Sequence, residues 1–522
     1  MLFNSYEFIF LFLPVVLIGF FGIGRLKNHR AAILWLVAAS LFFYGWWNPV
    51  YLCLILGSIV FNYTIGAGLA SECAPSNRFR KKIFFVTGIT GNLLLLCYFK
   101  YAHFFLDTVN ALTGTGFHLG KIVLPLAISF FTFQQIAYLA DVYRGETYER
   151  NFLHYCLFVT FFPQLIAGPI VHHKEVLPQF AKNTIYKVNH ERLALGITIF
   201  CIGLFKKVVL ADGIAAYASP VFAAAEHTAT LTFLEAWCGT LAYTFQIYFD
   251  FSAYSDMAIG LGQMFDIRLP LNFHSPYKAL SIIEFWKRWH ITLSRFLRDY
   301  LYIPLGGNRK GSPRRYLNIL VTMVLGGLWH GAGWTFVIWG TLHGVYIVAN
   351  HLWRTVFRSL KGSGAAVSSW WERALSHLTT FTAVVIAWVF FRAESFTGAV
   401  NMLAAMSGKN GIPLPGLRIT YPLIGERITT SFRLHSGNFM YSFKGCFVFL
   451  LFLFIIAWFF PSTQEFTLAY QPALETYSGR ERPRMRWLRF TLSPYWAVLL
   501  ALLSVYAIIN ISSATEFIYF TF

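Results

Sequence analysis

Ionisable residues gather between about residues 246 and 351 of an otherwise apolar chain. His330 is the first candidate for chemistry, since it lies in the glycine- and tryptophan-rich run GGLWHGAGW at 326–334. Glycines allow backbones to approach closely, and a neutral imidazole held there can take a proton from a hydroxyl near pH 7. The alternative is a buried structural histidine, and the spacing alone does not decide between the two.

A second group of polar residues lies at 284–299, in the run EFWKRWHITLSRFLRD. Its spacing predicts two helical i,i+4 ion pairs, Glu284 with Arg288 and Arg295 with Asp299. Tryptophans among basic residues suit an anchor helix at a membrane interface. The functional alternative is a basic lip for an anionic donor, formed together with the glycine-rich run at 302–311. The candidate donor-binding residues are Arg288, Arg295, Arg298 and Arg309.

Polar residues also interrupt the apolar runs at 246–256 (QIYFDFSAYSD) and 342–344 (LHG). On a helix, Asp250 and Asp256 are about 600° apart and do not share a face, which argues against a paired-carboxylate acid–base site. Asp250 and Ser252 are therefore expected to serve either helix packing or the shape of an active site. His343 is first interpreted as a buried structural histidine.

Several familiar catalytic and metal motifs are absent from the sequence. No G-x-S-x-G motif supports a serine nucleophile, and neither H-E-x-x-H nor paired C-x-x-C supports a metal site. The cysteines are expected to be buried thiols and not ligands or disulfides, because most lie in apolar runs. They are Cys53, Cys73, Cys97, Cys156, Cys201, Cys238 and Cys446.

The composition indicates a membrane protein. Hydrophobic residues make up 57 % and charged residues 12 % of the chain, about half the roughly 25 % charged share of soluble domains. The net charge of +19 comes from basic residues in short loops, which fits the positive-inside rule and argues against nucleic-acid binding. No linker divides the chain, so residues 1–522 are expected to form a single membrane-embedded domain.

Apolar runs of about 20 residues predict an all-α polytopic protein with about 11–12 transmembrane helices, plus re-entrant or interfacial helices. The candidate spans lie near 7–24, 31–48, 50–70, 83–99, 122–140, 196–219, 232–262, 318–332, 334–352, 376–392, 441–460 and 492–512.

Loops rich in Lys and Arg are expected to alternate with less basic loops along a multi-pass chain, and counting 152–171 as a span would break this alternation. The prolines and glycine of this segment, in FFPQ and AGP, predict a broken or re-entrant helix, since irregular backbone is tolerated at membrane depth only where protein or water satisfies it. With this assignment the basic loops 268–315 and 480–489 face the cytoplasm. Both termini then face outside.

At these motifs the sequence resembles the membrane-bound O-acyltransferase family, and within it the bacterial AlgI-like branch of alginate O-acetyltransferases. The resemblance runs from Phe3 to about Arg392 and is strongest between 241 and 344. Residues 393–522 are assigned to an extracytoplasmic loop and the last two transmembrane helices. The matching strings are LPLAISF (124–130), DVYRG (141–145), LIAGP (165–169), YFDFS (248–252), EFWKRWH (284–290) and LWHGA (328–332).

The resemblance implies a ring of tilted helices around a thin centre, where a cytoplasmic and an extracytoplasmic funnel meet. It matches the family's invariant histidine to His330 and its second active-site position to His290. His343 matches a histidine that is common in this branch. The supporting candidates in the matched motifs are Asp250, Ser252, Glu284 and Trp329.

The expected function is that of a membrane O-acyltransferase, most simply an O-acetyltransferase, of the bacterial inner membrane. It would move an acyl group from acetyl-CoA, or from an acyl carrier protein, to an extracytoplasmic polysaccharide such as alginate. His330 would be the general base, and His290 would position the acyl carbonyl or relay charge. Peptidoglycan, cellulose and a D-alanyl-type transfer are the alternatives.

The expected partners are membrane lipid, the glycan acceptor and an extracytoplasmic acetyltransferase of the SGNH-hydrolase type that could relay the acyl group. No bound cofactor, metal ion or nucleic acid is expected. Two rival classes are a transporter, which would carry internal repeats that the sequence lacks, and a non-catalytic scaffold for envelope assembly.

Overall fold

The structure, a computed structural model, describes residues 1–71, 78–227, 230–361, 369–411, 421–423, 426–428, 443–474, 488–511 and 518. In these residues the regular elements are helices, apart from one short antiparallel hairpin of β1 (Tyr421–Leu423) with β2 (Glu426–Ile428). The all-α prediction is confirmed, and each apolar run predicted as a span contains a helix.

The first half of the chain forms shorter helices, several of them interrupted by π-helical turns. They are η1 (Phe8–Phe12), α1 (Leu13–Arg25), α2 (His29–Gly45), α3 (Val50–Ser71), α4 (Arg78–Leu96), η3 (Cys97–Tyr101), α5 (Ala102–Thr113), α6 (Ile128–Arg144), α7 (Phe152–Thr160), α8 (Phe162–Leu165), α9 (His173–Phe180), α10 (His190–Phe205) and η5 (Lys206–Ala211).

The chain from residue 212 onward holds the longest helices. They are α11 (Asp212–Glu226), α12 (Phe233–Met264), α13 (Ile282–Arg288), α14 (Ile291–Leu297), η7 (Arg298–Tyr302), α15 (Gly311–His330), α16 (Trp334–Lys361), α17 (Trp370–Arg392), α18 (Phe396–Met406), α19 (Phe443–Phe459), α20 (Thr463–Phe466) and α21 (Pro494–Ile509).

Five helical segments of the described chain are long and apolar enough to cross a membrane by themselves. They are Phe8–Arg25, Val50–Ser71, Arg78–Thr113, His190–Glu226 and Trp370–Arg392. α2, α18, α19 and α21 are also apolar but shorter. The remaining predicted spans, among them α12, α15 and α16, carry the polar residues of the sequence motifs, which lowers their hydropathy.

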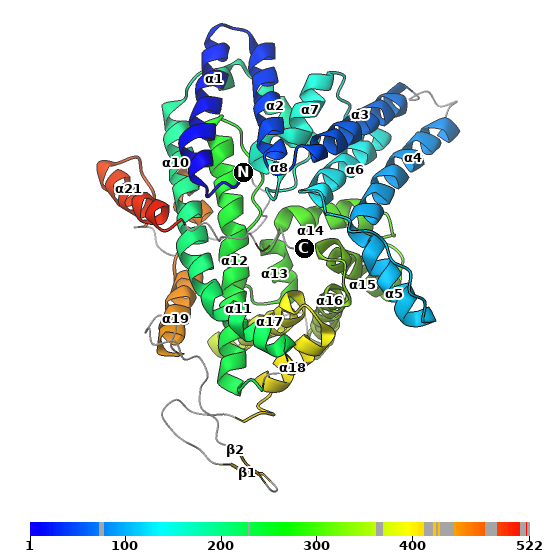
Figure 1. The fold of residues 1–522 in the computed structure, drawn as a ribbon, viewed down its shortest axis with the longest axis vertical. Helices are drawn as coiled ribbons and strands as arrows, with labels where there is room; N and C mark the ends of the chain where they lie inside the picture. Colours follow the sequence, from blue (N-terminus) through cyan, green and yellow to red (C-terminus); the bar gives the residue numbers. More distant parts are fainter. Residues whose placement is uncertain are drawn as a thin grey trace.

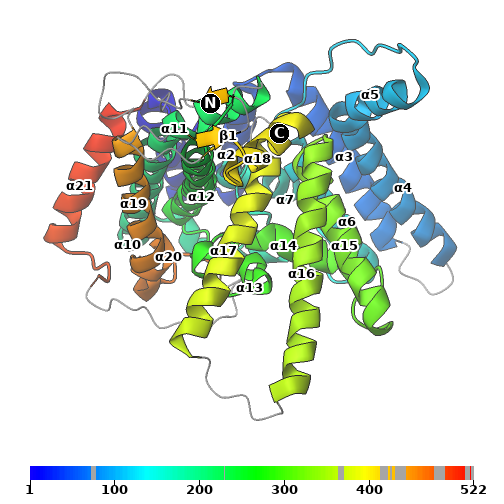
Figure 2. The same ribbon diagram turned by 90° about the horizontal axis from the view of Figure 1, so that it is seen from below.

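The helices surround a centre that is occupied by α13 and α14 in both views (Figures 1 and 2). α19 and α21 lie at one edge of the molecule, and α4 and α5 lie at the opposite edge. α12 packs against α10 and α11, and α15 packs against α16. Two short helices from the middle of the sequence are thereby enclosed by longer ones.

The segment predicted to be a broken helix is indeed broken. α7 ends at Thr160, the four-residue α8 begins with Pro163 in its first turn, and irregular chain follows up to α9. The carbonyl of Phe158 accepts hydrogen bonds from the side-chain amides of Gln134 (2.7 Å) and Gln164 (2.8 Å). Buried side-chain amides therefore satisfy backbone that the break leaves open, as required away from water.

Candidate active site

His330 is the last residue of α15, and aromatic side chains enclose its ring. The helix ends there because Gly331 is extended, and a Cβ at that glycine would collide with the ring of Phe336. The centroid of the His330 ring lies 5.0 Å from that of Trp339 and 5.3 Å from that of Phe391. The predicted helix break at the GGLWHGAGW run is confirmed, and it buries the imidazole.

His290 lies at the break between α13 and α14, in a backbone conformation that residues other than glycine rarely adopt. Its φ is 43°. Such a conformation stores about 1–3 kcal/mol of strain and persists only where the surroundings fix it. The His290 ring centroid is 6.2 Å from that of His330 and 4.8 Å from that of Phe251. The structure therefore brings the two predicted catalytic histidines next to each other, with their ring planes at 57°.

Asn272 determines which nitrogen of His290 carries the proton. The Oδ1 of Asn272 accepts hydrogen bonds from the backbone N–H of Thr292 (3.3 Å) and from the Thr292 hydroxyl (2.9 Å). Since this oxygen is an acceptor, the Nδ1 of His290 at 3.1 Å must be a donor. Nε2 is then the unprotonated nitrogen, the form of imidazole that can take a proton.

His343 lies beside the other two histidines, in contact with two tryptophans. Its Nδ1 accepts a hydrogen bond of 3.2 Å from the indole N–H of Trp286. Its ring centroid is 4.8 Å from that of Trp339, which also packs against His330. His343 is fully buried, so the structural role first assigned to it includes holding these two tryptophans in place.

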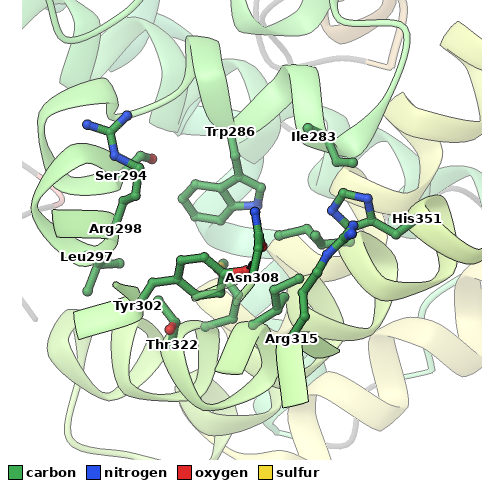
Figure 3. Close-up of a pocket in the computed structure, with 13 residues that line it drawn as sticks. Ile283, Trp286, Ser294, Leu297, Arg298, Tyr302, Asn308, Arg315, Thr322 and His351 are labelled. Atoms are coloured by element: carbon green, nitrogen blue, oxygen red, sulfur yellow. Dashed lines mark hydrogen bonds between the residues drawn. The ribbon is translucent and has the colours of Figure 1, made fainter. Parts of the chain in front are cut away.

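A cavity of about 490 Å³ lies beside Trp286 (Figure 3). Arg298 lies toward one side of it, and Arg315 and His351 lie toward the other. Its volume is within the roughly 300–1,000 Å³ of small-molecule sites, and two arginines beside apolar walls suit an anionic ligand with an apolar part. The lining consists of Ile283, Trp286, Ser294, Leu297, Arg298, Tyr302, Asn308, Arg315, Ile319, Thr322, Met323, Ile347 and His351.

The glycine-rich run at 302–311 shapes one wall of this cavity. Gly306 and Gly307 have φ values of 111° and 53°, in the region that favours glycine, and they turn the chain sharply. The hydroxyl of Tyr302 donates to the side-chain oxygen of Asn308, and both residues line the cavity. The glycine-rich run 302–311 therefore lies beside the cavity that also contains Arg298.

Of the four arginines predicted to bind the donor, Arg298 alone lines the cavity. Arg288 is 1 % exposed, and its guanidinium donates to Glu284 (2.7 and 3.0 Å) and to the carbonyl of His274 (3.3 Å). The predicted pair of Glu284 and Arg288 is confirmed. Arg288 is therefore a structural residue of α13, which corrects its assignment to the donor. Arg309 is exposed outside the cavity lining.

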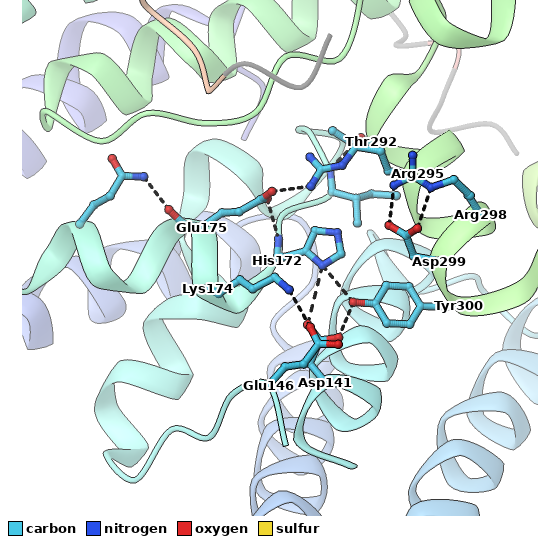
Figure 4. Close-up of polar contacts among 12 residues, drawn as sticks. Asp141, Glu146, His172, Lys174, Glu175, Thr292, Arg295, Arg298, Asp299 and Tyr300 are labelled. Carbon is cyan, nitrogen blue, oxygen red and sulfur yellow. Dashed lines mark hydrogen bonds and ion pairs between the residues drawn. The ribbon is translucent and has the colours of Figure 1, made fainter. Parts of the chain in front are cut away.

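The second predicted ion pair was wrong (Figure 4). Arg295 binds Glu175 of α9 at 2.5 Å, whereas Asp299 is bound by its neighbour Arg298 at 2.7 Å. The spacing failed because the chain changes from α14 to the π-helix η7 at Arg298. The hydrogen bond with Asp299 raises the pKa of Arg298, so the guanidinium beside the cavity stays charged.

A polar cluster around Tyr300 holds η7 (Figure 4). The hydroxyl of Tyr300 donates to Asp141 Oδ1 at 2.7 Å and lies 3.0 Å from the Nδ1 of His172. Arg144 packs its guanidinium over the Tyr300 ring at 5.1 Å. The DVYRG motif therefore helps to hold the helix that carries Arg298.

Asp250 and Asp256 each bind a lysine of η5. Lys207 Nζ lies 2.6 Å from Asp250 Oδ1 and 2.8 Å from Asp212 Oδ1, and Lys206 Nζ lies 2.8 Å from Asp256 Oδ2. The separate partners confirm that the two carboxylates do not share a face. Their contacts support the helix-packing interpretation of this motif.

The run EFWKRWH is part of the core, so the interfacial-anchor interpretation was wrong. Trp289 is 2 % exposed and packs against Trp388, with ring centroids 5.0 Å apart and ring planes tilted by 52°. Trp329, a predicted supporting residue, contacts both histidines, with its ring centroid 5.9 Å from His290 and 4.9 Å from His330. Ser252 is buried nearby on α12, and the described residues offer its hydroxyl no hydrogen-bond partner.

Three residues of the site were not found from the sequence. Asn272 lies in irregular chain 18 residues before His290, where no spacing rule connects them. Trp339 was one aromatic among many in α16. Lys100 lies far from these motifs in the sequence, yet its Nζ donates to the carbonyls of Trp329 (2.6 Å) and His330 (3.0 Å).

Comparison with known proteins shows the family to which the chain is similar. A model of the membrane-bound O-acyltransferase family matches residues 147–370, which include the whole of the histidine site apart from Lys100 and Phe391. The peptidoglycan O-acetyltransferase of Helicobacter pylori is 44 % identical over 485 residues, covering 87 % of this chain and 89 % of the relative.

Two further relatives are informative. The probable alginate O-acetylase AlgI of Pseudomonas aeruginosa is 45 % identical over 414 residues, covering 78 % of this chain and 75 % of the relative. The teichoic acid D-alanyltransferase of Bacillus subtilis is 27 % identical over 287 residues, covering 53 % of this chain and 70 % of the relative. The chain therefore belongs to the membrane-bound O-acyltransferase family, and it is a multi-pass membrane O-acetyltransferase with bacterial relatives.

Proposed function

We propose that this O-acetyltransferase moves an acetyl group from a cytoplasmic thioester to peptidoglycan outside the membrane. The observation that supports this acceptor is the 44 % identity to the Helicobacter pylori peptidoglycan enzyme over 87 % of the chain. Alginate, the acceptor first expected, becomes the second candidate, because the Pseudomonas aeruginosa relative is 45 % identical but covers 78 % of the chain.

In the proposed reaction His330 is the general base. It takes the proton of the acceptor hydroxyl, whose oxygen attacks the carbonyl carbon of the thioester. The tetrahedral oxyanion then collapses, the carbon–sulfur bond breaks, and the thiolate takes the proton from His330. General-base catalysis of this kind contributes roughly 10²–10⁴-fold to the rate. The burial of His330 among aromatic rings supports this role because it excludes competing water.

His290 is proposed to accept a hydrogen bond from the incoming acceptor hydroxyl, before His330 takes its proton, and not to hold the acyl carbonyl. The hydrogen bond from its Nδ1 to Asn272 leaves Nε2 without a proton, and such a nitrogen accepts but does not donate. The centroids of His290 and His330 are 6.2 Å apart. A hydroxyl between the rings has a single proton, so it donates to one imidazole nitrogen at a time, over about 2.6–3.2 Å.

The donor is proposed to enter through the cavity beside Trp286. This tryptophan lines the cavity and packs against Trp339 at 5.8 Å, and Trp339 packs against His330 at 5.0 Å. Arg298 and Arg315 would bind the phosphates of the donor. Acetyl-CoA is the simplest donor, and a carrier protein with a phosphate-linked thioester arm is the alternative.

The orientation of the chain and its partners remain part of the proposal. The basic segment 268–315 is expected in the cytoplasm and the N-terminus outside. Part of the basis for this orientation lies outside the described residues. The residues concerned are four arginines of the basic loop 480–489, namely Arg480, Arg482, Arg484 and Arg486, and the C-terminal Phe522. An extracytoplasmic acetyltransferase of the SGNH-hydrolase type is the expected relay to the glycan.

Mass spectrometry of cell-wall fragments tests the acceptor. Fragments from cells that express the chain should carry O-acetyl groups that disappear when the gene is deleted. A His330→Ala copy should fail to restore them, whereas the unaltered chain should succeed. Unchanged peptidoglycan acetylation, with acetyl groups lost from an exopolysaccharide, would overturn the peptidoglycan assignment and favour alginate. Unchanged acetylation of every glycan would instead favour the scaffold or transporter classes.

A further inference from the structure

The end of α15 is held by side chains from a distant part of the sequence. Lys100 Nζ donates to the carbonyls of Trp329 (2.6 Å) and His330 (3.0 Å), and the hydroxyl of Tyr101 donates to the carbonyl of Leu328 (2.8 Å). Three consecutive carbonyls of the last turn therefore receive hydrogen bonds from two consecutive residues of η3. Helix ends leave such carbonyls without partners inside the helix, so an external donor has a defined role here.

The local chain does not supply the usual C-terminal cap. Many helices end with a glycine at positive φ, whose backbone N–H and that of the next residue bond back to the last carbonyls. Gly331 instead has φ −155° and ψ 146°, and the chain leaves the helix in an extended conformation. Because Gly331 is extended, it does not form this glycine cap. The donors of η3 bond to the last carbonyls instead.

A lysine is also an unusual choice for this position. An ammonium group inside a membrane domain is costly, which makes each such group a candidate for function. Its charge is favourable at the C-terminus of a helix, where the dipole is negative. Tyr101, by contrast, is uncharged, and its hydroxyl donates to the carbonyl of Leu328, the residue before Trp329. The two neighbours therefore provide a lysine Nζ donor at His330 and a hydroxyl donor at Leu328.

We propose that Lys100 is a positioning residue for His330. Its ammonium group fixes the carbonyl of His330 itself, and thereby the direction in which the imidazole faces His290. The side chain acts on the backbone and not on the reacting atoms. This inference rests on the proposed function of His330 as general base.

The main variant is Lys100→Met, which keeps the length of the side chain and removes the ammonium group. Tyr101→Phe is the matched control, because it removes a hydrogen bond to the same helix end without touching His330. Lys100→Arg tests for rescue, since arginine retains the charge and the donors. Lys100→Gln, which retains a donor without the charge, replaces Lys100→Met if that variant does not fold. Each full-length variant is reconstituted in lipid vesicles, and acetyl transfer from acetyl-CoA is followed by thiol release.

Lys100→Met should lower kcat at least tenfold and leave the KM for acetyl-CoA within twofold, because the donor cavity is not altered. Lys100→Arg should recover at least a third of kcat, and Tyr101→Phe should stay within threefold of the unaltered chain. A kcat of Lys100→Met within threefold of the unaltered chain would overturn the inference. An equal loss in Tyr101→Phe would also overturn it, since that result indicates general anchoring of α15.

His330→Ala in the same assay separates this inference from the proposed function. If His330→Ala keeps more than a tenth of the activity, the general-base assignment fails, and with it any positioning role of Lys100. If His330→Ala is inactive while Lys100→Met is unaffected, the positioning inference alone fails. A loss in both variants, with rescue by Lys100→Arg, supports both statements.

Discussion

Replacing Asn272 by alanine should disable transfer without touching either histidine. The Oδ1 of Asn272 accepts three hydrogen bonds, at 3.1 Å from His290 and at 2.9 and 3.3 Å from Thr292. Without them, Nδ1 of His290 loses the partner that fixes its tautomer, and the ring can turn away from His330. A misplacement of about 1 Å at a reacting group can cost about 10²-fold in rate. Asn272→Ala should therefore lower kcat about 100-fold.

The same substitution should also lower stability by a measurable amount. It leaves the buried backbone N–H of Thr292 without the acceptor that Asn272 provides, and an unsatisfied buried donor costs about 1–3 kcal/mol. Thermal unfolding in detergent should therefore begin at a lower temperature. Activity is best measured well below that temperature, so that the loss of kcat is not a loss of folded protein.

Ser255→Ala is the control for this prediction. Ser255 accepts a hydrogen bond of 3.2 Å from the Nδ2 of Asn272, on the side of the amide that faces away from His290. Removing it leaves the Oδ1 contacts intact, so kcat should stay within threefold of the unaltered chain. The reasoning is refuted if Asn272→Ala also stays within threefold, because the tautomer of His290 would then be irrelevant to the rate.

Four further predictions concern the site and its surroundings. His330→Ala should leave expression near normal and reduce transfer at least 100-fold, the lower limit for losing a general base, as measured by glycan-bound acetate. Arg298→Gln should raise the KM for acetyl-CoA about tenfold or more, whereas Arg309→Gln, outside the cavity, should not; equal effects would remove Arg298 from the donor site. Arg309→Cys should react with an impermeant thiol reagent in inside-out vesicles and not in intact cells; labelling in intact cells would reverse the orientation. Lys207→Met should destabilise the protein by about 3–5 kcal/mol in thermal or denaturant unfolding, the cost of stranding a buried carboxylate, and adding Asp250→Asn should restore part of that loss.

The fold was largely predictable because its signals are local. Apolar runs of span length located the helices, and the prolines of 152–171 located the break between α7 and α8. The GGLWHGAGW run located the end of α15, because its glycines are required where α16 comes close. A Cβ at Gly327 or at Gly340 would collide with backbone atoms of the facing helix.

The contacts of the site were less predictable because they join distant parts of the chain. Helical spacing correctly paired Glu284 with Arg288 but wrongly paired Arg295 with Asp299, since the backbone becomes π-helical at Arg298. No local pattern shows that Glu175 would lie beside Arg295. The interfacial-anchor interpretation of 284–290 failed for a related reason, because tryptophans suit both a membrane interface and a crowded core.

The strained backbone of His290 gives a physical reason for the interruption between α13 and α14. A regular helix through 282–297 would satisfy more backbone hydrogen bonds and would avoid a positive φ at a residue other than glycine. The interruption is instead stabilised from outside, because the backbone N–H of Ile291 donates to the carbonyl of Asn272 at 2.9 Å. Asn272 thus fixes both the backbone after His290 and the tautomer of its ring. The role proposed for His290, which requires a fixed ring and an unprotonated Nε2, agrees with both contacts.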